Sequence, residues 1–196
     1  MTPSTLDFQA AGALIVYYAQ YSWGNITFIH LVTGECAMAI KTNAMRNLEK
    51  AGIPYSAHTY DHSDGLIDGI SVAKKMGQPV EQVFKTLVAQ GTSGEYYVFI
   101  IPVADELDLK AAARTVGEKA IEMIKVKDIN KITGYIRGGC SPIEMKKEYK
   151  TVLDSSCKGL DTIIVSAGKI GYQIELSPND LIGITHCGTE NITMQK

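Results

Sequence analysis

A single lysine interrupts the apolar run Val83-Phe84-Lys85-Thr86-Leu87-Val88-Ala89. The β-rich residues from Thr86 to Gln90 and from Tyr96 to Pro102 flank the turn signal Gly91-Thr92-Ser93-Gly94, which predicts a β-hairpin. Burying an ammonium costs several kcal/mol unless it is paired or loses its proton, so Lys85 marks a candidate site within this hairpin. The alternative is an edge lysine whose amine reaches solvent.

Patterning on either side of the hairpin predicts an α+β domain. Thr42 and Ser177 are typical N-caps, and Gly52, Gly77 and Gly117 are typical helix stops. The predicted helices cover 42–51, 70–77, 108–116 and 128–132, with a helical turn over 79–83 and a last helix that begins at Pro178. The further predicted strands cover 55–60, 151–154, 162–165 and 171–176. There are more predicted strands than a strict alternation of strands and helices would give. We therefore expect a single domain with a mixed, curved, barrel-like sheet and flanking helices.

Composition narrows the class of protein. The 196 residues carry a formal net charge of −2, with 45% hydrophobic and 20% charged residues, as in an ordinary soluble domain. No global positive field indicates DNA binding, so any RNA contact must come from a local patch. The four cysteines are widely spaced and lack a C-x-x-C pair, which argues against zinc and against a disulfide framework. We expect reduced thiols, a cytoplasmic location and no metal.

The first forty residues differ from the rest of the chain. All 19 lysines and arginines lie at position 41 or later, and Asp7 and Glu35 are the only charges before it. The apolar run Ala10 to Ala19 is too short for a membrane span and has no basic residue before it, so neither a membrane anchor nor a secretory signal is indicated. We expect translation to start at Met38, which would make residues 1–37 a non-native or disordered extension. A genuine extension that packs on the domain is the alternative.

The loop Arg137-Gly138-Gly139-Cys140-Ser141-Pro142 is the second candidate for chemistry. A glycine-rich turn exposes backbone N–H groups, so Gly138, Gly139 and Ser141 are candidate donors to an oxyanion. Lys85 would then hold a carbonyl oxygen or a phosphate, or accept a proton if burial lowers its pKa, and Thr86 adds a hydroxyl. A turn without a ligand is the simpler reading of this loop alone.

Other familiar sites are absent from the sequence. It contains no G-x-S-x-G, GxxxxGK[ST], HExxH or G-x-G-x-x-G pattern. His58 and His62 have a possible metal spacing, but no further ligand is indicated, which favours ordinary surface histidines. Cys140 lacks a histidine or aspartate placed by motif to activate it, so a nucleophilic role is the less favoured reading.

Several short segments, weak singly, are specific in their order and spacing from about Lys41 to Ile184. These segments are His58-Thr59-Tyr60-Asp61-His62, Val83-Phe84-Lys85-Thr86-Leu87, Pro102-Val103-Ala104 before Leu107-Asp108-Leu109-Lys110, Thr133-Gly134-Tyr135 before Gly138-Gly139-Cys140-Ser141-Pro142, and Val165-Ser166-Ala167-Gly168-Lys169 before Ile174-Glu175-Leu176. In this combination the chain resembles the YbaK/EbsC family of aminoacyl-tRNA deacylases, which is similar to the editing domain of bacterial prolyl-tRNA synthetase.

The resemblance implies an enzyme without a metal or other cofactor that deacylates Cys-tRNA(Pro). It places the catalytic lysine at Lys85 and further pocket positions at Tyr60, Thr86, Gly138 and Ser166. It implies that the thiol of the substrate cysteine attacks its own ester, and that prolyl-tRNA synthetase is a partner.

Two positions depart from the family's pattern. Gln173 stands where some relatives have an aspartate, so it would bind an amino group more weakly than a carboxylate does. Asp68 stands where some relatives have an aromatic residue. Two alternatives stay open: a non-catalytic module that binds tRNA or the synthetase, and a deacylase for another small aminoacyl group.

Overall fold

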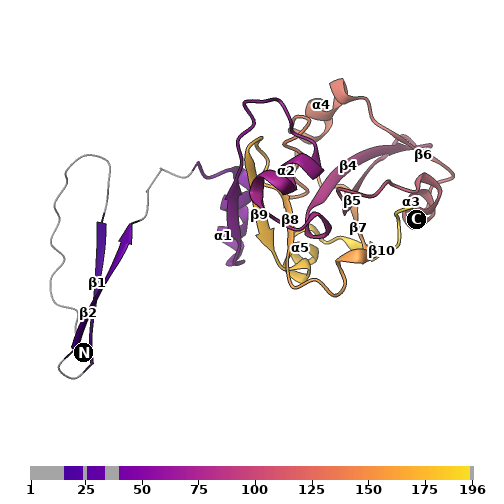
Figure 1. The fold of residues 1–196 in the computed structure, drawn as a ribbon. Helices are drawn as coiled ribbons and strands as arrows, with labels where there is room; N and C mark the ends of the chain where they lie inside the picture. The colour runs from indigo at the N-terminus through magenta and orange to yellow at the C-terminus, as the bar shows by residue number, and fades with distance from the viewer. Residues whose placement is uncertain (1–15, 24–25, 34–39, 195–196) are drawn as a thin grey trace. The chain divides into compact units, whose positions relative to one another are not determined.

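The computed structural model describes residues 16–23, 26–33 and 40–194, and the chain separates into two compact units, 1–40 and 41–196 (Figure 1). In the first unit, β1 (Val16–Trp23) and β2 (Ile26–Thr33) form an antiparallel hairpin in which Trp23 pairs with Ile26. The predicted start at Met38 lies outside the described residues. The origin of residues 1–37 therefore stays a prediction.

A five-stranded mixed sheet organises the second unit. The predicted hairpin is confirmed: β4 (Phe84–Gly91) pairs with β5 (Tyr96–Pro102) in antiparallel register, with Lys85 opposite Ile101. The strand order is β10-β7-β5-β4-β6, in which β7 (Lys150–Asp154) runs parallel to both β5 and β10 (Gly188–Glu190). The short strand β6 (Ile121–Met123) covers only the far end of β4, so the Lys85 end of β4 is left for other elements.

A separate three-stranded antiparallel sheet lies next to that end. Its order is β3 (Ser56–Thr59), β9 (Tyr172–Leu176) and β8 (Ile163–Ser166). An isolated bridge between Val83 and Ile164 links β8 to the residue before β4. The α+β class with a mixed sheet is thus confirmed, while the strands form two sheets that do not close into a barrel.

The helices begin and end close to the predicted residues. They are α1 (Asn43–Ala51), α2 (Gly69–Met76), α3 (Leu109–Val116), α4 (Ile129–Thr133) and α5 (Pro178–Thr185), with 3-10 turns at Val80–Gln82, Val126–Asp128 and Ser155–Cys157. The hydroxyls of Thr42 and Ser177 cap α1 and α5 as predicted. Asp68 caps α2 by accepting a hydrogen bond from the amide of Ser71.

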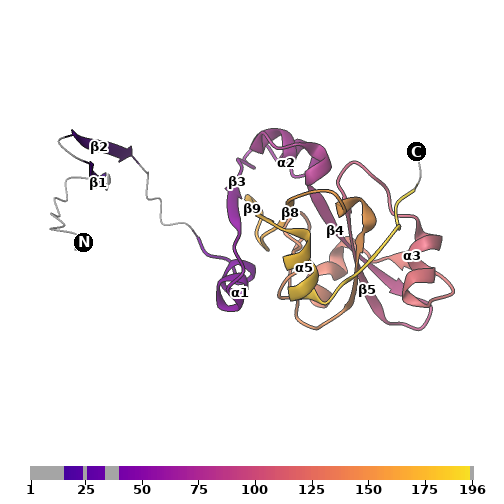
Figure 2. The ribbon, with the colours of Figure 1, turned by 90° about the horizontal axis from the view of Figure 1, so that it is seen from below.

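Strand β5 is buried on both faces, and this places the two halves of the core. On one face, Phe99 and Ile101 pack against α3. On the other face, Ile100 packs with α1, α5 and the three-stranded sheet. Figure 2 shows α3 and α5 apart, separated by the hairpin strands β4 and β5. Because β4 pairs with β5 from Phe84 to Gln90, this pairing positions the backbone that carries Lys85.

Candidate active site

A cavity of about 170 Å³ lies where β4 begins. Strands β8 and β9, the start of α2 and the glycine-rich loop complete its wall. The lining residues are Ile67, Gly69, Val72, Val83, Phe84, Lys85, Thr86, Val103, Gly138, Cys140, Ser166 and Gln173. The cavity is smaller than the ~300–1,000 Å³ of pockets for drug-sized ligands, so it suits a small group.

Lys85 supplies the cation of this cavity. Its Nζ donates a hydrogen bond to the carbonyl oxygen of Val103 at 3.1 Å. That carbonyl is held in place because the Val103 amide donates to the Val83 carbonyl at 2.9 Å. Burial lowers the pKa of Lys85, while the charges of Glu106 and Asp105 oppose this shift. The ammonium is therefore partly stripped of water, and its interaction with a bound oxygen is stronger than it would be at the surface.

Thr86 adds an oxygen with no bound partner. Its Oγ1 is buried and makes no hydrogen bond to any described residue. Tyr60 has a similarly buried and unpartnered hydroxyl, but Tyr60 does not line the cavity. Its backbone amide donates to the Gly171 carbonyl at 3.0 Å. A buried hydroxyl without a partner is costly, so a ligand that bonds to Thr86 would recover that cost.

The glycine-rich loop approaches Lys85 through one of its three predicted donors. Gly138 lines the cavity with φ +82°, and a Cβ there would lie 2.7 Å from Cδ1 of Ile67. Gly139 and Ser141 do not line the cavity. The Gly139 amide donates to the Ile136 carbonyl at 3.0 Å within the turn, and the fully buried Ser141 Oγ accepts from the Ile143 amide at 3.2 Å.

A tyrosine fixes this loop against the turn after β8. The Tyr135 hydroxyl donates to the Ile143 carbonyl at 2.6 Å, and burial raises the pKa of Tyr135 to about 12, so it stays a donor. Its ring covers Gly168, where a Cβ would lie 2.8 Å from the ring. The Gly168 amide in turn donates to Ser166 Oγ at 3.3 Å. This packing brings Ser166 and Gly138 to one cavity although 28 residues separate them in the sequence (166 − 138 = 28).

The opposite wall comes from β9. Gln173, which is buried, pairs with Ser166 on one side and with His58 on the other. His58 Nε2 lies 2.7 Å from a carboxylate oxygen of Glu175, which also accepts from Thr162 Oγ1 at 2.6 Å. The described residues contain no cluster of three or more His, Cys, Asp or Glu arranged to hold a metal.

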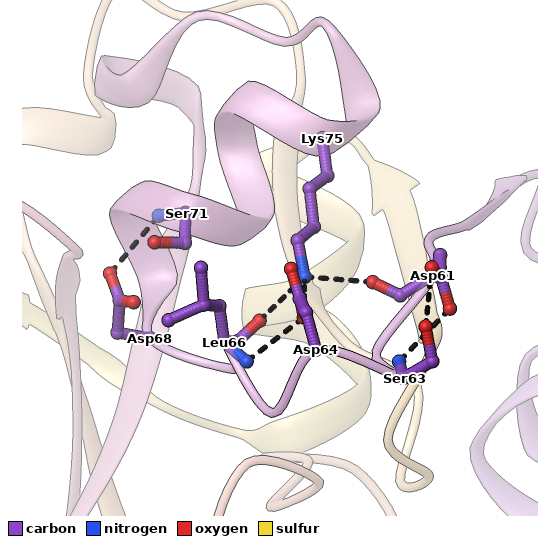
Figure 3. A network of polar contacts seen from close by, with 7 residues as sticks. All are labelled: Asp61, Ser63, Asp64, Leu66, Asp68, Ser71 and Lys75. Atoms are coloured by element: carbon purple, nitrogen blue, oxygen red, sulfur yellow. Dashed lines mark hydrogen bonds and ion pairs between the residues drawn. The ribbon is translucent and has the colours of Figure 1, made fainter.

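The loop between β3 and α2 contributes Ile67 to the cavity lining, and Lys75 holds this loop to α2 (Figure 3). The Lys75 amine donates to the Asp61 carbonyl at 2.8 Å, the Leu66 carbonyl at 2.9 Å and Oδ1 of Asp64 at 2.6 Å. One ammonium therefore ties three points of the loop to α2. Because Ile67 directly follows Leu66 in the chain, we expect this network to help position the Ile67 side chain beside Gly138.

Sequence reasoning missed part of the wall. Ile67, Gly69, Val72 and Val103 line the cavity, and a Cβ on Gly69 would lie 2.2 Å from Cγ1 of Val103. The only sequence signal for this close approach of α2 to Val103 was the glycine that directly follows Asp68. Cys140 also lines the cavity, but burial raises the pKa of its thiol to about 11. A hydrogen bond with Thr133 lowers this pKa and opposes only part of the shift. A thiol with that pKa is a poor nucleophile near neutrality.

Among the residues that the structure describes, no helix is both long enough and apolar enough to cross a membrane.

Comparison with known proteins gives a consistent result. The model of the aminoacyl-tRNA editing domain family matches residues 69–184, which include all the cavity residues except Ile67. A curated relative from Enterococcus faecalis (strain ATCC 700802 / V583), EbsC, is named as a candidate Cys-tRNA(Pro)/Cys-tRNA(Cys) deacylase. It is 43% identical over 156 residues, covering 80% of this chain and 95% of the relative.

Solved structures support the same fold. A protein named as a candidate trans-editing enzyme for prolyl tRNA synthetase superposes with a TM-score of 0.66 at 21% identity, covering 79% of this chain and 99% of that one. The hypothetical protein APE2540 gives a TM-score of 0.69 at 18% identity, covering 75% and 96%. At these identities the likeness concerns the fold alone.

Proposed function

Because this chain belongs to the aminoacyl-tRNA editing domain family, we propose that it is a trans-acting deacylase that removes cysteine from mischarged tRNA(Pro). The observation that carries the proposal is the half-buried ammonium of Lys85, which shares a small cavity with the unpartnered hydroxyl of Thr86. The name given to the 43% identical relative supports cysteine as the amino acid.

In this proposal the cavity holds the cysteinyl ester. Lys85 binds the ester carbonyl oxygen and stabilises the negative charge that develops on it. Thr86 donates a hydrogen bond to the same group or to the ribose. Gly138, whose lack of a Cβ keeps the cavity open beside Ile67, allows the acyl carbon to approach the loop backbone. Ser166 and Gln173 offer polar groups to the α-amino group on the other side.

The reaction itself uses the substrate's thiol. Its sulfur attacks the ester carbonyl carbon, the S–C bond forms, the C–O bond to the ribose breaks, and the thiol proton passes to the ribose oxygen. Water then opens the cyclic thiolactone and releases cysteine. Holding the two reacting groups in one geometry lowers the barrier by several kcal/mol. The raised pKa of Cys140, to about 11, supports this route because the nearest protein thiol stays protonated.

The proposal includes a setting and a partner. The enzyme acts in the cytoplasm and receives its substrate while associated with prolyl-tRNA synthetase. A net charge of −2 supports this part, because a weakly charged protein gains little non-specific affinity for tRNA by itself.

Single-turnover deacylation tests the proposal. Purified protein is mixed with Cys-tRNA(Pro), Ser-tRNA(Pro) and Ala-tRNA(Pro), and ester loss is followed over the uncatalysed background. We expect rapid loss of cysteine and near-background loss of serine and alanine, because a hydroxyl is a weaker nucleophile and alanine has none. Absence of cysteine release would refute the activity, and equally fast release of alanine would refute the substrate-thiol route.

A further inference from the structure

A second and larger hollow lies at the far end of β4. We call it the hairpin groove. Its volume is about 570 Å³, and its lining includes Gln90, Tyr96, Lys125, Lys127, Asp128 and Ile132. The residues come from the β4–β5 hairpin and from the segment that runs from β6 to α4. In Figure 1, β6 is labelled close to the far end of β4.

The hairpin groove and the reaction cavity lie at the two ends of one strand. Side chains alternate along β4, so Thr86 in the cavity and Gln90 in the groove point to the same side, while Lys85 points to the other. Four residues of strand separate Thr86 from Gln90, which is about 13 Å at ~3.3 Å per residue. The chain from Lys125 through α4 to Gly138 follows the same course from groove to cavity. A few nucleotides of extended single strand span this distance.

Two lysines of the groove are free to contact phosphates. Lys125 and Lys127 line it and are exposed, and neither makes an ion pair with a described residue. Glu122 and Asp128 also line the groove, so the charges of the lining itself balance. Exposed Lys119 and Lys131 lie near these residues in the sequence but do not line the groove. Affinity for a phosphate backbone would therefore depend on the positions of Lys125 and Lys127 and not on the net charge of the lining.

An aromatic ring supplies a stacking surface in the same groove. Tyr96 lies edge-to-face with Tyr149, with ring centroids 6.3 Å apart. The Tyr149 hydroxyl donates to the Ile132 carbonyl at 2.8 Å, which holds this pair against α4. Proteins that bind single-stranded nucleic acid combine such rings, which stack with bases, with lysines that contact the backbone.

We propose that the hairpin groove binds the unpaired nucleotides that precede the aminoacylated 3′-terminal nucleotide of the substrate RNA, with Lys125 and Lys127 on phosphates and Tyr96 against a base. This inference rests on the proposed function, because the deacylation cavity fixes where the 3′ terminus lies. The groove gives the weakly charged protein its own contact with the substrate strand.

Two substrates separate the groove from the reaction. Cysteinyl-tRNA(Pro) reaches both sites, whereas the cysteinyl ester of adenosine reaches the cavity alone. We expect the Lys125→Ala/Lys127→Ala variant to lose about tenfold in kcat/KM on the tRNA, and its salt dependence to flatten by about 1.4 in the log–log slope, from ~0.7 per lost phosphate contact. Hydrolysis of the short ester should be unchanged. The matched control Lys50→Ala/Lys158→Ala, which removes two exposed lysines elsewhere, should behave as the parent protein on both substrates.

Direct binding keeps the inference testable if the reaction fails. A labelled RNA hairpin that carries the unpaired 3′ end of tRNA(Pro) is titrated by fluorescence anisotropy. The lysine double variant and Tyr96→Leu should bind about tenfold more weakly, whereas Tyr96→Phe should bind as the parent. The proposed role of the groove would be wrong if the variants bound the RNA as tightly as the parent. It would also be wrong if the lysine double variant lost the same factor in kcat/KM on both substrates, or if it lost only its binding to the synthetase. If the parent hydrolyses neither ester, the proposed function fails, and the anisotropy result then decides the groove by itself.

Discussion

Replacing Lys75 by methionine tests whether the β3–α2 loop shapes the reaction cavity. The change keeps the apolar stem but removes the ammonium that donates to two backbone carbonyls and to Asp64. A hydrogen bond from a charged donor contributes about 1.5 kcal/mol at the low end of its range, so the two bonds to backbone carbonyls contribute about 3 kcal/mol. The pair with the exposed Asp64 adds little because solvent screens it. Because water replaces part of these bonds, we expect a loss of about 2 kcal/mol in the free energy of unfolding.

The same variant should change catalysis in a particular way. The loop carries Ile67, which lines the cavity, but not Lys85, so KM for Cys-tRNA(Pro) should rise several-fold while kcat changes less. Urea denaturation measures the stability, and steady-state deacylation measures KM and kcat. Lys74→Met, at the adjacent exposed lysine, is the control. The reasoning is wrong if Lys75→Met and Lys74→Met are indistinguishable in both stability and KM.

Three further changes test other parts of the structure. Gly138→Ala should cost about 1–2 kcal/mol in the free energy of unfolding because of its φ of +82°, and it should reduce deacylation because the new Cβ meets Ile67. Urea denaturation and rate assays measure the two effects. The control Gly94→Ala, where φ is +91° and the space is open, should lose stability only, and Gly138→Ala/Ile67→Ala should recover activity. Hydrogen bonds from Ser93, Tyr97 and Thr92 hold the pKa of Glu118 at about 2, below its ordinary 4.5, so its stabilisation is present above pH 4.5 and is lost as the pH falls through 2. Thermal melts should therefore show a larger drop in Tm between pH 5 and pH 2 for the parent than for Glu118→Gln, and parallel curves would contradict this assignment. Asp68→Ala should lose about 1 kcal/mol in urea denaturation through the α2 cap, whereas Asp68→Asn should lose little, and equal losses would exclude capping as the cause.

Local patterns predicted those parts of the fold that depend on neighbours in sequence. The hairpin of β4 and β5 and the caps at Thr42 and Ser177 follow from side-chain alternation and from capping chemistry, and the structure contains them. The short strands β6 and β10 were not predicted because each exists only through pairing with a distant strand. Division of the strands into two sheets likewise depends on long-range pairing.

The same distinction between local and long-range contacts separates the site residues that were predicted from those that were missed. Lys85 could be predicted as a candidate because a charge in an apolar run is visible in the sequence itself, and the structure places it in the cavity lining. Ile67 and Val103 were missed because their positions depend on the Lys75 network and on the Val83 hydrogen bond, which are contacts between segments. Turn chemistry predicted donors in the glycine-rich loop, and of the three predicted residues Gly138 lines the cavity. It did not show that the Gly139 amide and the Ser141 hydroxyl are used within the loop.

The role of Lys85 is tested most directly by single-turnover deacylation of Cys-tRNA(Pro) with the parent protein and with Lys85→Met, purified in parallel. Removing a group that stabilises the developing oxyanion costs about 10²–10³ in rate. The variant loses the hydrogen bond to the Val103 carbonyl but no longer places an ammonium in a partly buried site, so we expect it to unfold at a urea concentration close to that of the parent. We therefore predict at least a hundredfold loss of ester cleavage in a fully folded variant. Cleavage by Lys85→Met at the parent rate would contradict the account.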